Sequence, residues 1–226
     1  MTKVAIVQLD DRSDEELGAL IGLVQRNMAY AEARGYGHIF VRNPDPSIPV
    51  YWAKVYAVKK VLESGFDIVA WLDTDVVIHD FSRRIESLFE QPEQAFVYAQ
   101  DVPVWVERFG FNAGVFFCRG AFGRALLADW WSLLSENMHL WTKTDGRWVC
   151  STPSFGSTGY EQGAFVENLL PRFSGTPQFR EVPWTLLQSP FPVPESFTLH
   201  FHGALRQNVA PYLAYIGAQK GERTAD

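Results

Sequence analysis

The stretch DIVAWLDTDVVI, from Asp67 to Ile78, is an almost continuous apolar run that two carboxylates, Asp73 and Asp75, interrupt. Its first part, Ile68–Leu72, has the length and composition of a buried strand. Alternate residues of an extended chain point to the same side, so both carboxylates can face one point in space. Because ligands of an open parallel sheet bind beyond the carboxyl ends of its strands, we expect a binding site here.

The N-terminal stretch predicts a strand, a helix and a second strand. An apolar, β-branched run at Val4–Leu9 is typical of a buried strand, and the aspartates that follow it indicate a loop. Ser13 and Glu16 have the spacing of a capping box, which begins a helix, and Gly35 is the expected end of that helix. A second strand is expected at His38–Arg42. This βαβ spacing implies a parallel sheet covered by helices.

The same alternation of elements continues along the chain. Further helices are expected at about Val50–Ser64, at about Phe122–Asn137, around Glu161–Leu170 and at the C-terminus, and further strands at Ala95–Gln100, Ala113–Cys118, Phe179–Val182 and Phe197–Phe201. The segment Thr142–Gly159 is rich in Gly, Ser and Thr and has little periodicity, so we expect a long loop without secondary structure. No repeat or linker interrupts the pattern. The sequence therefore predicts one α/β domain over residues 1–226, with a mostly parallel central sheet flanked by helices.

Composition and charge exclude several classes of protein. Of 226 residues, 47% are hydrophobic and 20% charged, as in a globular protein rather than a disordered chain, a fibre or a coiled coil. The formal net charge of −6 provides no field that attracts nucleic acid. No run approaches the roughly 18 apolar residues of a transmembrane helix, and the start, MTKVAIVQLDDR, is unlike a signal peptide. We therefore expect a cytoplasmic protein without a nucleic-acid partner, and the oligomeric state stays open.

The paired carboxylates require a positive partner. Two like charges at the edge of a core need a counter-charge, or one of them takes up a proton. A divalent cation meets this need, and oxygen ligands suit Mg²⁺ or Mn²⁺, whose other ligands usually come from phosphates and water. The alternative is a solvated turn, because Asp-x-Asp also occurs without a metal. The pattern Asp73-Thr74-Asp75 is thus a candidate site for Mn²⁺ or Mg²⁺.

A second group of candidate ligands lies in TLHFHG, residues 198–203. His200 and His202 are one residue apart near a strand end, and imidazole is a borderline ligand for Mn²⁺. A hydrogen-bonded histidine inside the fold is the alternative. Gly203 allows a close approach of the backbone, and Arg206 suits a diphosphate because it neutralises charge that a cation leaves exposed. The group indicates a metal beside a phosphorylated ligand.

Six short motifs extend this interpretation. They are YWAKVYAV (51–58), IVAWLDTDVVI (68–78), AQD (99–101), FNAGVFFCR (111–119), YEQGAF (160–165) and LHFHG (199–203). In this order, over about residues 1–206, the chain resembles the GT-A fold glycosyltransferases, closest to the retaining glycogenin-like and α-galactosyl-, xylosyl- and mannosyltransferase groups. The resemblance implies a single Rossmann-like GT-A domain, with a nucleotide-binding half at about 1–100 and an acceptor-binding half at about 101–226. It also implies a Mn²⁺-dependent transfer of a sugar from a UDP- or GDP-sugar.

The resemblance implies a role for each matching residue. The metal ligands would be Asp73, Asp75 and His200. The residues that bind the nucleotide and the diphosphate would be Leu9, Asp10, Lys54, Asp73, Thr74, Gly203 and Arg206, the last standing where glycogenin-like enzymes carry a lysine. Asp101 and Asn112 would hold the hydroxyls of the donor sugar, and Glu161 and Gln162 would lie beside its anomeric carbon. Asp101, Glu161 and Gln162 are therefore the expected catalytic residues, whereas His202 matches a variable position and is expected to be structural.

Aromatic residues make up 15% of the chain, with 8 Trp and 17 Phe. Most of them are expected to pack in the core. Five lie in or beside predicted loops, where they are candidates for stacking on a sugar: Tyr51, Trp52, Trp105, Trp148 and Phe155. These loop aromatics indicate where an acceptor binds.

Two mechanisms and several functions stay open. If the transfer retains the configuration of the sugar, as the resemblance implies, the leaving phosphate can deprotonate the acceptor hydroxyl of a saccharide or glycoconjugate. If it inverts, a carboxylate must act as the base, and Glu161 or Asp101 is the candidate. The loop at Thr142–Gly159 would be a lid that excludes water. The alternative functions are a glycosidase with two carboxylates, a nucleotide-sugar hydrolase and an inactive nucleotide-sugar-binding module.

Overall fold

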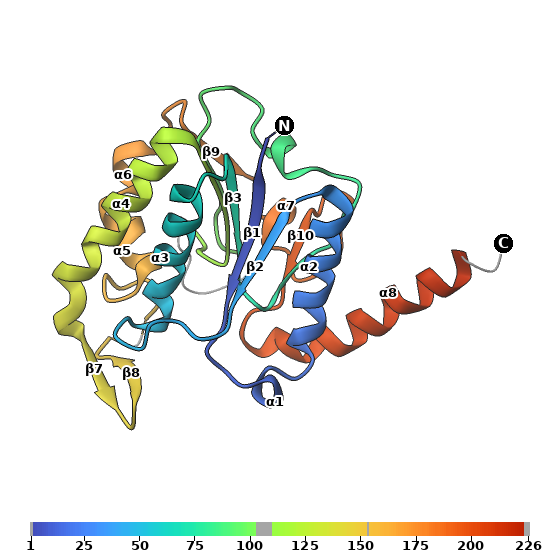
Figure 1. Cartoon of the computed structure of the whole chain (residues 1–226), viewed down its shortest axis with the longest axis horizontal. Helices are drawn as coiled ribbons and strands as arrows, with labels where there is room; N and C mark the ends of the chain where they lie inside the picture. The colour runs from blue at the N-terminus through green and yellow to red at the C-terminus, as the bar shows by residue number, and fades with distance from the viewer. Residues whose placement is uncertain (1, 103–109, 153, 224–226) are drawn as a thin grey trace.

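A six-stranded sheet forms the centre of the computed structural model, which describes residues 2–102, 110–152 and 154–223 (Figure 1). In spatial order its strands are β2 (Gly37–Val41), β1 (Val4–Leu9), β3 (Ile68–Leu72), β6 (Val115–Arg119), β5 (Phe96–Ala99) and β9 (Phe179–Val182). Of these six strands only β6 runs antiparallel to its neighbours, whereas β2, β1 and β3 are parallel, as are β5 and β9. The predicted α/β fold with a mostly parallel central sheet is confirmed.

Helices cover both faces of this sheet. They are α1 (Asp14–Leu17), α2 (Leu20–Arg34), α3 (Val50–Glu63), α4 (Gly120–Asn137), α5 (Glu161–Asn168), α6 (Leu170–Phe173), α7 (Trp184–Leu187) and α8 (Val209–Arg223), with the 3₁₀ helices η1 (Ile85–Leu88), η2 (Met138–Leu140) and η3 (Gly203–Asn208). Helices α3 and α4 pack together on one face and α2 lies on the other, while the outer part of α8 extends away from the body (Figure 1). No helix among the described residues is both long enough and apolar enough to cross a bilayer.

Strand β3 is buried on both faces, as its continuous apolar sequence indicates. Val69 and Trp71 point into the core beneath α3 and α4, and Ile68, Ala70 and Leu72 point into the core on the α2 side. Such alternation fixes the register of the strand, because a shift of one residue would exchange the two sets of side chains. The carboxylates that follow β3 are therefore held at a defined place.

The predicted N-terminal helix is divided into two. Its capping box is present, since Ser13 Oγ accepts from the backbone of Glu16 at 3.2 Å and the Glu16 carboxylate accepts from the backbone of Ser13 at 2.8 Å. Helix α1 nevertheless ends at once, because Gly18 adopts φ 52°, a conformation that a helix cannot continue. Helix α2 then runs to the expected end, where Gly35 is left-handed.

The run Asp67–Ile78 contains two strands in two sheets. After β3, the strand β4 (Val76–Ile78) pairs antiparallel with β10 (Thr198–His200) in a separate two-stranded sheet. The residues 73–75 between them form a turn, closed by a hydrogen bond from Val76 N–H to Asp73 O at 3.0 Å. This turn carries both carboxylates to the boundary between the sheets.

The segment Thr142–Gly159 is not a loop without secondary structure, so that expectation was wrong. Strands β7 (Trp141–Thr144) and β8 (Arg147–Cys150) form an antiparallel hairpin. Both turn residues have positive φ, 51° at Asp145 and 78° at Gly146, as in the primed turns that connect such hairpins. The Asp-Gly pair is itself a signal for a hairpin, and the polar composition around it obscured that signal.

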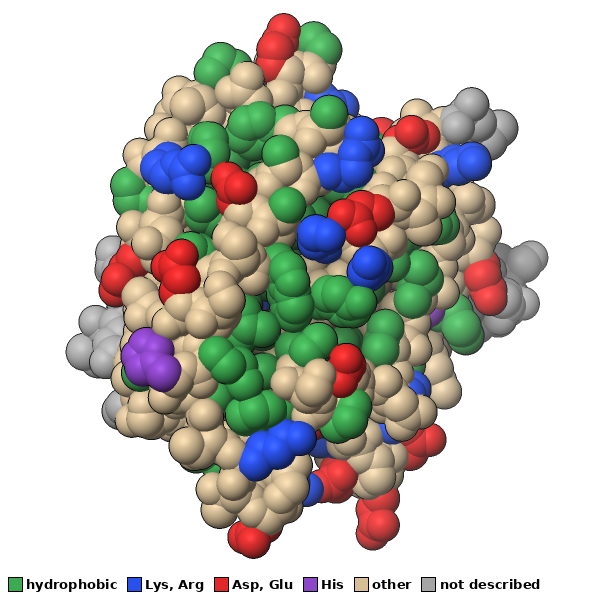
Figure 2. Space-filling view, turned by 60° about the vertical axis from the view of Figure 1, so that its left-hand side comes forward, with side chains coloured by type: hydrophobic (Ala, Val, Ile, Leu, Met, Phe, Trp, Pro, Cys, Tyr) green, Lys and Arg blue, Asp and Glu red, His purple; other side chains and the backbone are tan. Residues whose placement is uncertain are grey.

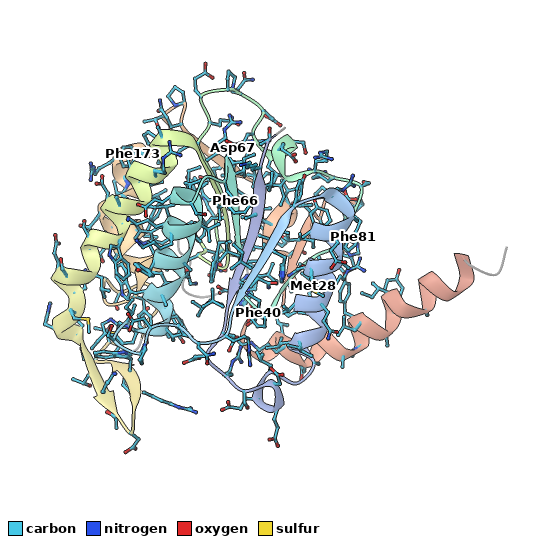
Figure 3. All side chains as sticks on the ribbon, viewed as in Figure 1. Met28, Phe40, Phe66, Asp67, Phe81 and Phe173 are labelled. Atoms are coloured by element: carbon cyan, nitrogen blue, oxygen red, sulfur yellow. The ribbon has the colours of Figure 1, made fainter. Side chains whose placement is uncertain are left out.

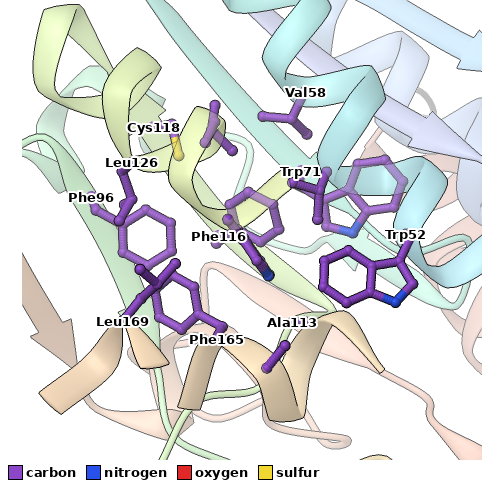
Figure 4. Packing of buried hydrophobic residues seen from close by; sticks show 14 of the residues in the cluster. Trp52, Val58, Trp71, Phe96, Ala113, Phe116, Cys118, Leu126, Phe165 and Leu169 are labelled. Carbon is purple, nitrogen blue, oxygen red and sulfur yellow. The ribbon is translucent and has the colours of Figure 1, made fainter. Parts of the chain in front are cut away.

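Aromatic rings fill the core beneath α3 and α4 (Figure 4). The ring of Phe165 on α5 lies 4.5 Å from Phe111, 4.6 Å from Trp130 and 5.3 Å from Phe96, centroid to centroid. Because all four side chains are fully buried, they join α5 and α4 to the sheet. Most of the aromatic excess is thus packing, as the sequence predicted.

The other face has a smaller aromatic cluster beside α2. The ring centroid of Tyr30 lies 5.3 Å from that of Phe81 and 6.1 Å from that of Phe197, and Phe81 lies next to α2 in Figure 3.

On the surface, Lys and Arg side chains alternate with Asp and Glu around a central group of hydrophobic side chains on the face in Figure 2. Charge on this face is therefore mixed in sign.

We expect Phe165→Ala to lower the free energy of unfolding by about 3–5 kcal/mol, because it removes a buried ring that joins α5 to three others. Urea unfolding followed by circular dichroism measures the change. Phe191→Ala, at a side chain 58% exposed, is the control and is expected to change stability by less than about 0.5 kcal/mol. Equal losses in the two variants would contradict the packing described for α5.

Candidate functional site

Asp73, Asp75 and His200 meet at one point although they come from distant parts of the chain. The turn after β3 carries the two aspartates, and His200 ends β10, where the antiparallel register sets it opposite Val76. One ligand atom from each of the three side chains lies within 4.8 Å of the others. Two carboxylates and an imidazole at this spacing can hold a divalent cation. The structure thus brings together the three predicted metal ligands.

The carboxylate of Asp75 is buried among positive partners. Its Oδ1 lies 3.3 Å from His200 Nε2, and its Oδ2 accepts from Arg206 Nε at 2.9 Å and Nη2 at 2.7 Å. Burial raises the pKa of Asp75, but hydrogen bonds and charge from His200 and Arg206 outweigh it, so its pKa is well below the usual range. Asp75 is therefore ionised and can bind a cation at neutral pH.

Lys54 connects Asp73, a predicted metal ligand, to helix α5. Its Nζ donates to Asp73 Oδ1 at 3.1 Å, to Glu161 Oε1 at 2.9 Å and to the carbonyl of Ala113 at 3.3 Å. Burial opposes the charge on Lys54, yet the two carboxylates raise its pKa above the ordinary value. The positively charged ammonium group of Lys54 is therefore fixed beside Asp73 before any ligand binds.

Glu161 faces this lysine from inside the fold. It is 3% exposed, and burial raises its pKa while the charge of Lys54 opposes that rise. Its second oxygen, Oε2, is buried without a hydrogen-bond partner among the described residues. Gln162, the next residue, accepts from the backbone N–H of Ala113 at 2.8 Å. Gln162 thus lies against the loop before β6, whereas the Glu161 carboxylate contacts Lys54.

The same loop brings two more predicted residues together. Asn112 is buried, and its amide donates to the carboxylate of Asp101 at 3.1 Å, while its own oxygen accepts from the backbone of Gly114 at 2.8 Å. Asp101 also accepts from the backbone of Val102 at 2.8 Å. This arrangement gives both side chains one orientation, at the end of β5 and the start of β6.

Asp10 begins a second polar cluster at the end of β1. Arg12 binds its carboxylate with two hydrogen bonds, from Nε at 2.9 Å and from Nη2 at 2.7 Å, and the hydroxyl of Thr74 donates to it at 2.5 Å. Burial raises the pKa of Asp10, but these partners more than compensate, and its pKa is lowered. The cluster connects the end of β1 to the turn after β3.

A cavity of about 330 Å³ lies in front of these groups. Seven predicted site residues line it: Leu9, Asp10, Lys54, Asp73, Thr74, Asp75 and Arg206. Gly203, with φ 59°, begins η3, the short helix that carries Arg206. The ring of His202 packs against that of His200, 4.8 Å away. The polar lining and the basic side chains suit an anionic, polar ligand.

A second cavity, of about 640 Å³, adjoins the first and shares Arg12 and Tyr51 with it. Trp148, from the β7–β8 hairpin, also lines this second cavity.

Among the other loop aromatics, Phe155 is 49% exposed and its ring centroid lies 5.5 Å from that of Tyr51. The expectation for Trp52 was wrong, because it is fully buried and donates to the carbonyl of Gly159. Trp105 lies outside the described residues.

Comparison with known proteins shows which fold this is. The sequence matches no protein-family model and no curated protein. In structure the chain is similar to a glycosyltransferase involved in the glycosylation of the major capsid of PBCV-1, with a TM-score of 0.69 and 15% identity over 94% of this chain and 99% of that one. It is also similar to the glycosyltransferase GlyE of Streptococcus pneumoniae TIGR4, with a TM-score of 0.54 and 14% identity over 94% of this chain and 60% of that one. The fold is that of GT-A glycosyltransferases.

Two polar residues of this GT-A fold were not predicted from the sequence. Arg12 follows Asp10 by two residues, the spacing of the Asx turn that its backbone makes with the Asp10 carboxylate at 3.0 Å, and this spacing is a usable signal. Gln188 accepts from His200 and donates to the carbonyl of Asn112, but no pattern in the sequence around it indicates either contact. Both residues orient predicted ones rather than extend the set of ligands.

We expect Arg12→Met to lower the free energy of unfolding by about 1–3 kcal/mol at pH 7, because it leaves the buried Asp10 carboxylate without its main partner. The folded-state pKa of Asp10 is below its ordinary value of 3.8. Its ionisation therefore stabilises the fold above that value, and this stabilisation is lost as the pH falls through the folded pKa. The difference between wild type and variant should shrink towards pH 3.5.

Urea unfolding at a series of pH values measures this difference. Arg172→Met is the control, since Arg172 and Asp129 are both more than half exposed and lie 3.7 Å apart, a pair that contributes little at any pH. A difference between wild type and Arg12→Met that is constant from pH 7 to pH 3.5 would rule out the proposed charge interaction.

Proposed function

We propose that the chain is a metal-dependent glycosyltransferase that transfers a sugar from a nucleoside diphosphate sugar to a hydroxyl of a saccharide or glycoconjugate acceptor. The observation that carries the proposal is that Asp73 and Asp75 line one polar cavity together with two basic side chains, Lys54 and Arg206. His200 contacts Asp75 from behind this lining. The GT-A glycosyltransferase fold supports it. A site that binds a metal and a diphosphate needs carboxylates for the cation and basic side chains for the phosphates, and this cluster contains both.

The residues present fit a divalent cation. Asp75 is ionised and buried, and His200 turns one ring nitrogen to it while Gln188 occupies the other, as is usual for a histidine that binds metal. Mn²⁺ or Mg²⁺ held by Asp73, Asp75 and His200 would stabilise the negative charge that develops on the departing diphosphate. Arg206 bonds the same carboxylate, so it lies where it can bind phosphate oxygens as well.

The donor is proposed to lie along the smaller cavity. Leu9 and Asp10 at the end of β1 would contact the nucleoside, with Thr74 and Arg12 holding the Asp10 carboxylate in place. Lys54 and Arg206 would bind the diphosphate. These groups come from four separate elements, so the donor would bind in one orientation only. A fixed orientation lowers the entropic part of the barrier to transfer.

Donor sugar contacts are proposed for Asp101, Asn112 and Gln162, with the Gly203 backbone approaching the diphosphate. The side chains of Asp101 and Asn112 are fixed by their mutual hydrogen bond, and that of Gln162 by the backbone of Ala113. Polar groups held in this way need no reorganisation when the sugar binds. In this proposal the N-terminal half, about 1–100, binds the nucleotide, and residues after about 101 contact the sugar.

We further propose that the transfer retains configuration. An inverting transfer needs a free carboxylate as base. Glu161 is 3% exposed and bound to Lys54, and Asp101 accepts from Val102 and Asn112. Because Glu161 is buried and paired with Lys54, and Asp101 Oδ1 already accepts two hydrogen bonds, the leaving phosphate is the better proton acceptor for the incoming hydroxyl. Glu161 would then act through Lys54 rather than on the substrate.

The acceptor is proposed to occupy the larger cavity. Tyr51 lies between the two cavities, and Trp148 offers a second ring on the hairpin. Aromatic faces combined with planar polar side chains are suited to saccharides, which stack on rings and hydrogen-bond at their edges. Trp148 Nε1 donates to Pro46 at 3.1 Å, so the hairpin reaches the loop before α3. This contact is compatible with the expected role of the hairpin as a lid.

We expect Asp75→Asn to reduce sugar transfer by about 100-fold or more, because a bound cation supplies several kcal/mol of charge stabilisation. The measurement is release of nucleoside diphosphate from a panel of UDP- and GDP-sugars with Mn²⁺, with and without saccharides. Asp129→Asn, at an exposed carboxylate of α4, is the matched control. Wild-type protein that binds no nucleotide sugar by calorimetry would refute the proposal, and release that saccharides never accelerate would indicate a hydrolase.

We expect Trp148→Ala to raise the KM for the acceptor by up to about tenfold and to leave the KM for the donor unchanged, because it removes a ring from the larger cavity only. Steady-state kinetics with each substrate varied in turn measure both constants. Tyr215→Ala, at a tyrosine 54% exposed on α8, should change neither. An equal rise in both constants would argue against a separate acceptor cavity.

A further inference from the structure

Gln188 is a fully buried amide that connects two parts of the site. It follows α7, and its backbone N–H bonds to the carbonyl of Trp184 at 2.7 Å, which ends that helix. Its side-chain Nε2 donates to the carbonyl of Asn112 at 3.3 Å, and its Oε1 lies 2.7 Å from His200 Nδ1. One side chain thus contacts both a proposed metal ligand, His200, and the loop before β6 that carries Asn112, called the sugar-side loop below.

The direction of these hydrogen bonds determines the state of the histidine. In an amide the nitrogen can only donate and the oxygen can only accept. Because Nε2 of Gln188 donates to a carbonyl, Oε1 is left facing His200, and Nδ1 of that ring has to carry the hydrogen. The other ring nitrogen, Nε2, lies 3.3 Å from Asp75 Oδ1. A proton on Nε2 bonds that carboxylate, and a cation that displaces this proton meets the Nε2 lone pair of the Nδ1–H ring, which is the form of histidine that binds a metal.

The ring is also confined on its other sides. A Cβ at Gly114 would lie 2.3 Å from His200 Cε1 and 3.0 Å from Nδ1, so only glycine fits there. The backbone of His200 donates to the carbonyl of Ser189 at 3.0 Å, next to Gln188. Rotation of the ring by half a turn would leave the Gln188 oxygen facing carbon. The surroundings therefore hold the imidazole in one orientation.

We infer that Gln188 is a positioning residue of the metal site, which holds His200 as the Nδ1–H tautomer with Nε2 directed at the cation. The inference rests on the proposed function in one respect, namely that the site binds a divalent cation. Through its second hydrogen bond Gln188 also fixes the carbonyl of Asn112, so the metal ligand and the sugar-side loop share one support. A purely structural amide would affect folding and leave metal affinity unchanged.

Metal affinity of the purified protein tests the inference without any measurement of activity. Gln188→Met keeps a similar volume and removes both hydrogen bonds. We expect it to weaken Mn²⁺ binding by about 10- to 100-fold, the usual effect of losing such an outer partner. The free Mn²⁺ signal in electron paramagnetic resonance measures the dissociation constant, with wild-type protein titrated in parallel. Gln188→Asn, which is too short to bridge both partners, gives the same comparison if the Met variant does not fold.

Two further variants separate positioning from structure. Gln188→Glu keeps an oxygen that accepts from Nδ1 but sets a second acceptor against the Asn112 carbonyl, so it should bind Mn²⁺ more tightly than Gln188→Met and less tightly than wild type. Asn137→Leu removes the hydrogen bond that a buried side-chain amide donates to the carbonyl of Leu133 on α4. It should therefore lower thermal stability and leave Mn²⁺ affinity unchanged. The inference would be overturned if Gln188→Met had the Mn²⁺ dissociation constant of wild type. It would also be overturned if Gln188→Glu bound Mn²⁺ as weakly as Gln188→Met. Failure of the proposed function has a different signature, because wild type itself would then not bind Mn²⁺.

Discussion

The buried ammonium group of Lys54 is the charge on which the rest of the site depends. It lies between Asp73, which lines the cavity, and Glu161, which lies inside the fold. Loss of Lys54 would leave the buried Glu161 carboxylate without its positive partner, at a cost of about 3–5 kcal/mol. Helix α3, the turn after β3 and helix α5 each supply one member, so these elements must pack together for the charges to balance. Packing and electrostatics are therefore coupled at this place.

The sequence predicts the parts of the fold whose signals are local. Strands Val4–Leu9 and Phe179–Val182 have the predicted bounds, and the capping box at Ser13 is present. The errors arise where one or two residues override their neighbours, as Gly18 does in ending α1 and Asp145-Gly146 does in folding a hairpin. The order of strands depends on contacts between distant segments. No local pattern could therefore indicate that antiparallel β6 separates β3 from β5.

The candidate site divides in the same way. The side chains proposed to touch a ligand stand in recognisable patterns, above all Asp73-Thr74-Asp75, and seven of the predicted residues line one cavity. The side chains that orient them have no such pattern, because a hydrogen bond from His200 to Gln188 is a property of the folded chain. Glu161 shows the limit most clearly. Its place beside Gln162 indicates a role near the sugar, yet its carboxylate lies against Lys54.

The pairing of β10 with β4 has a consequence for how the molecule is made. Arg206 and Asp75 are 131 positions apart, and His200 reaches the aspartates only when β10 adds to the edge of β4. During synthesis on the ribosome, both carboxylates emerge long before the imidazole that completes their group. The proposed metal site is therefore complete only after synthesis has passed His200, whereas the aromatic core beneath α3 and α4 is made before that point. In that proposal, metal affinity would report that β10 has paired with β4.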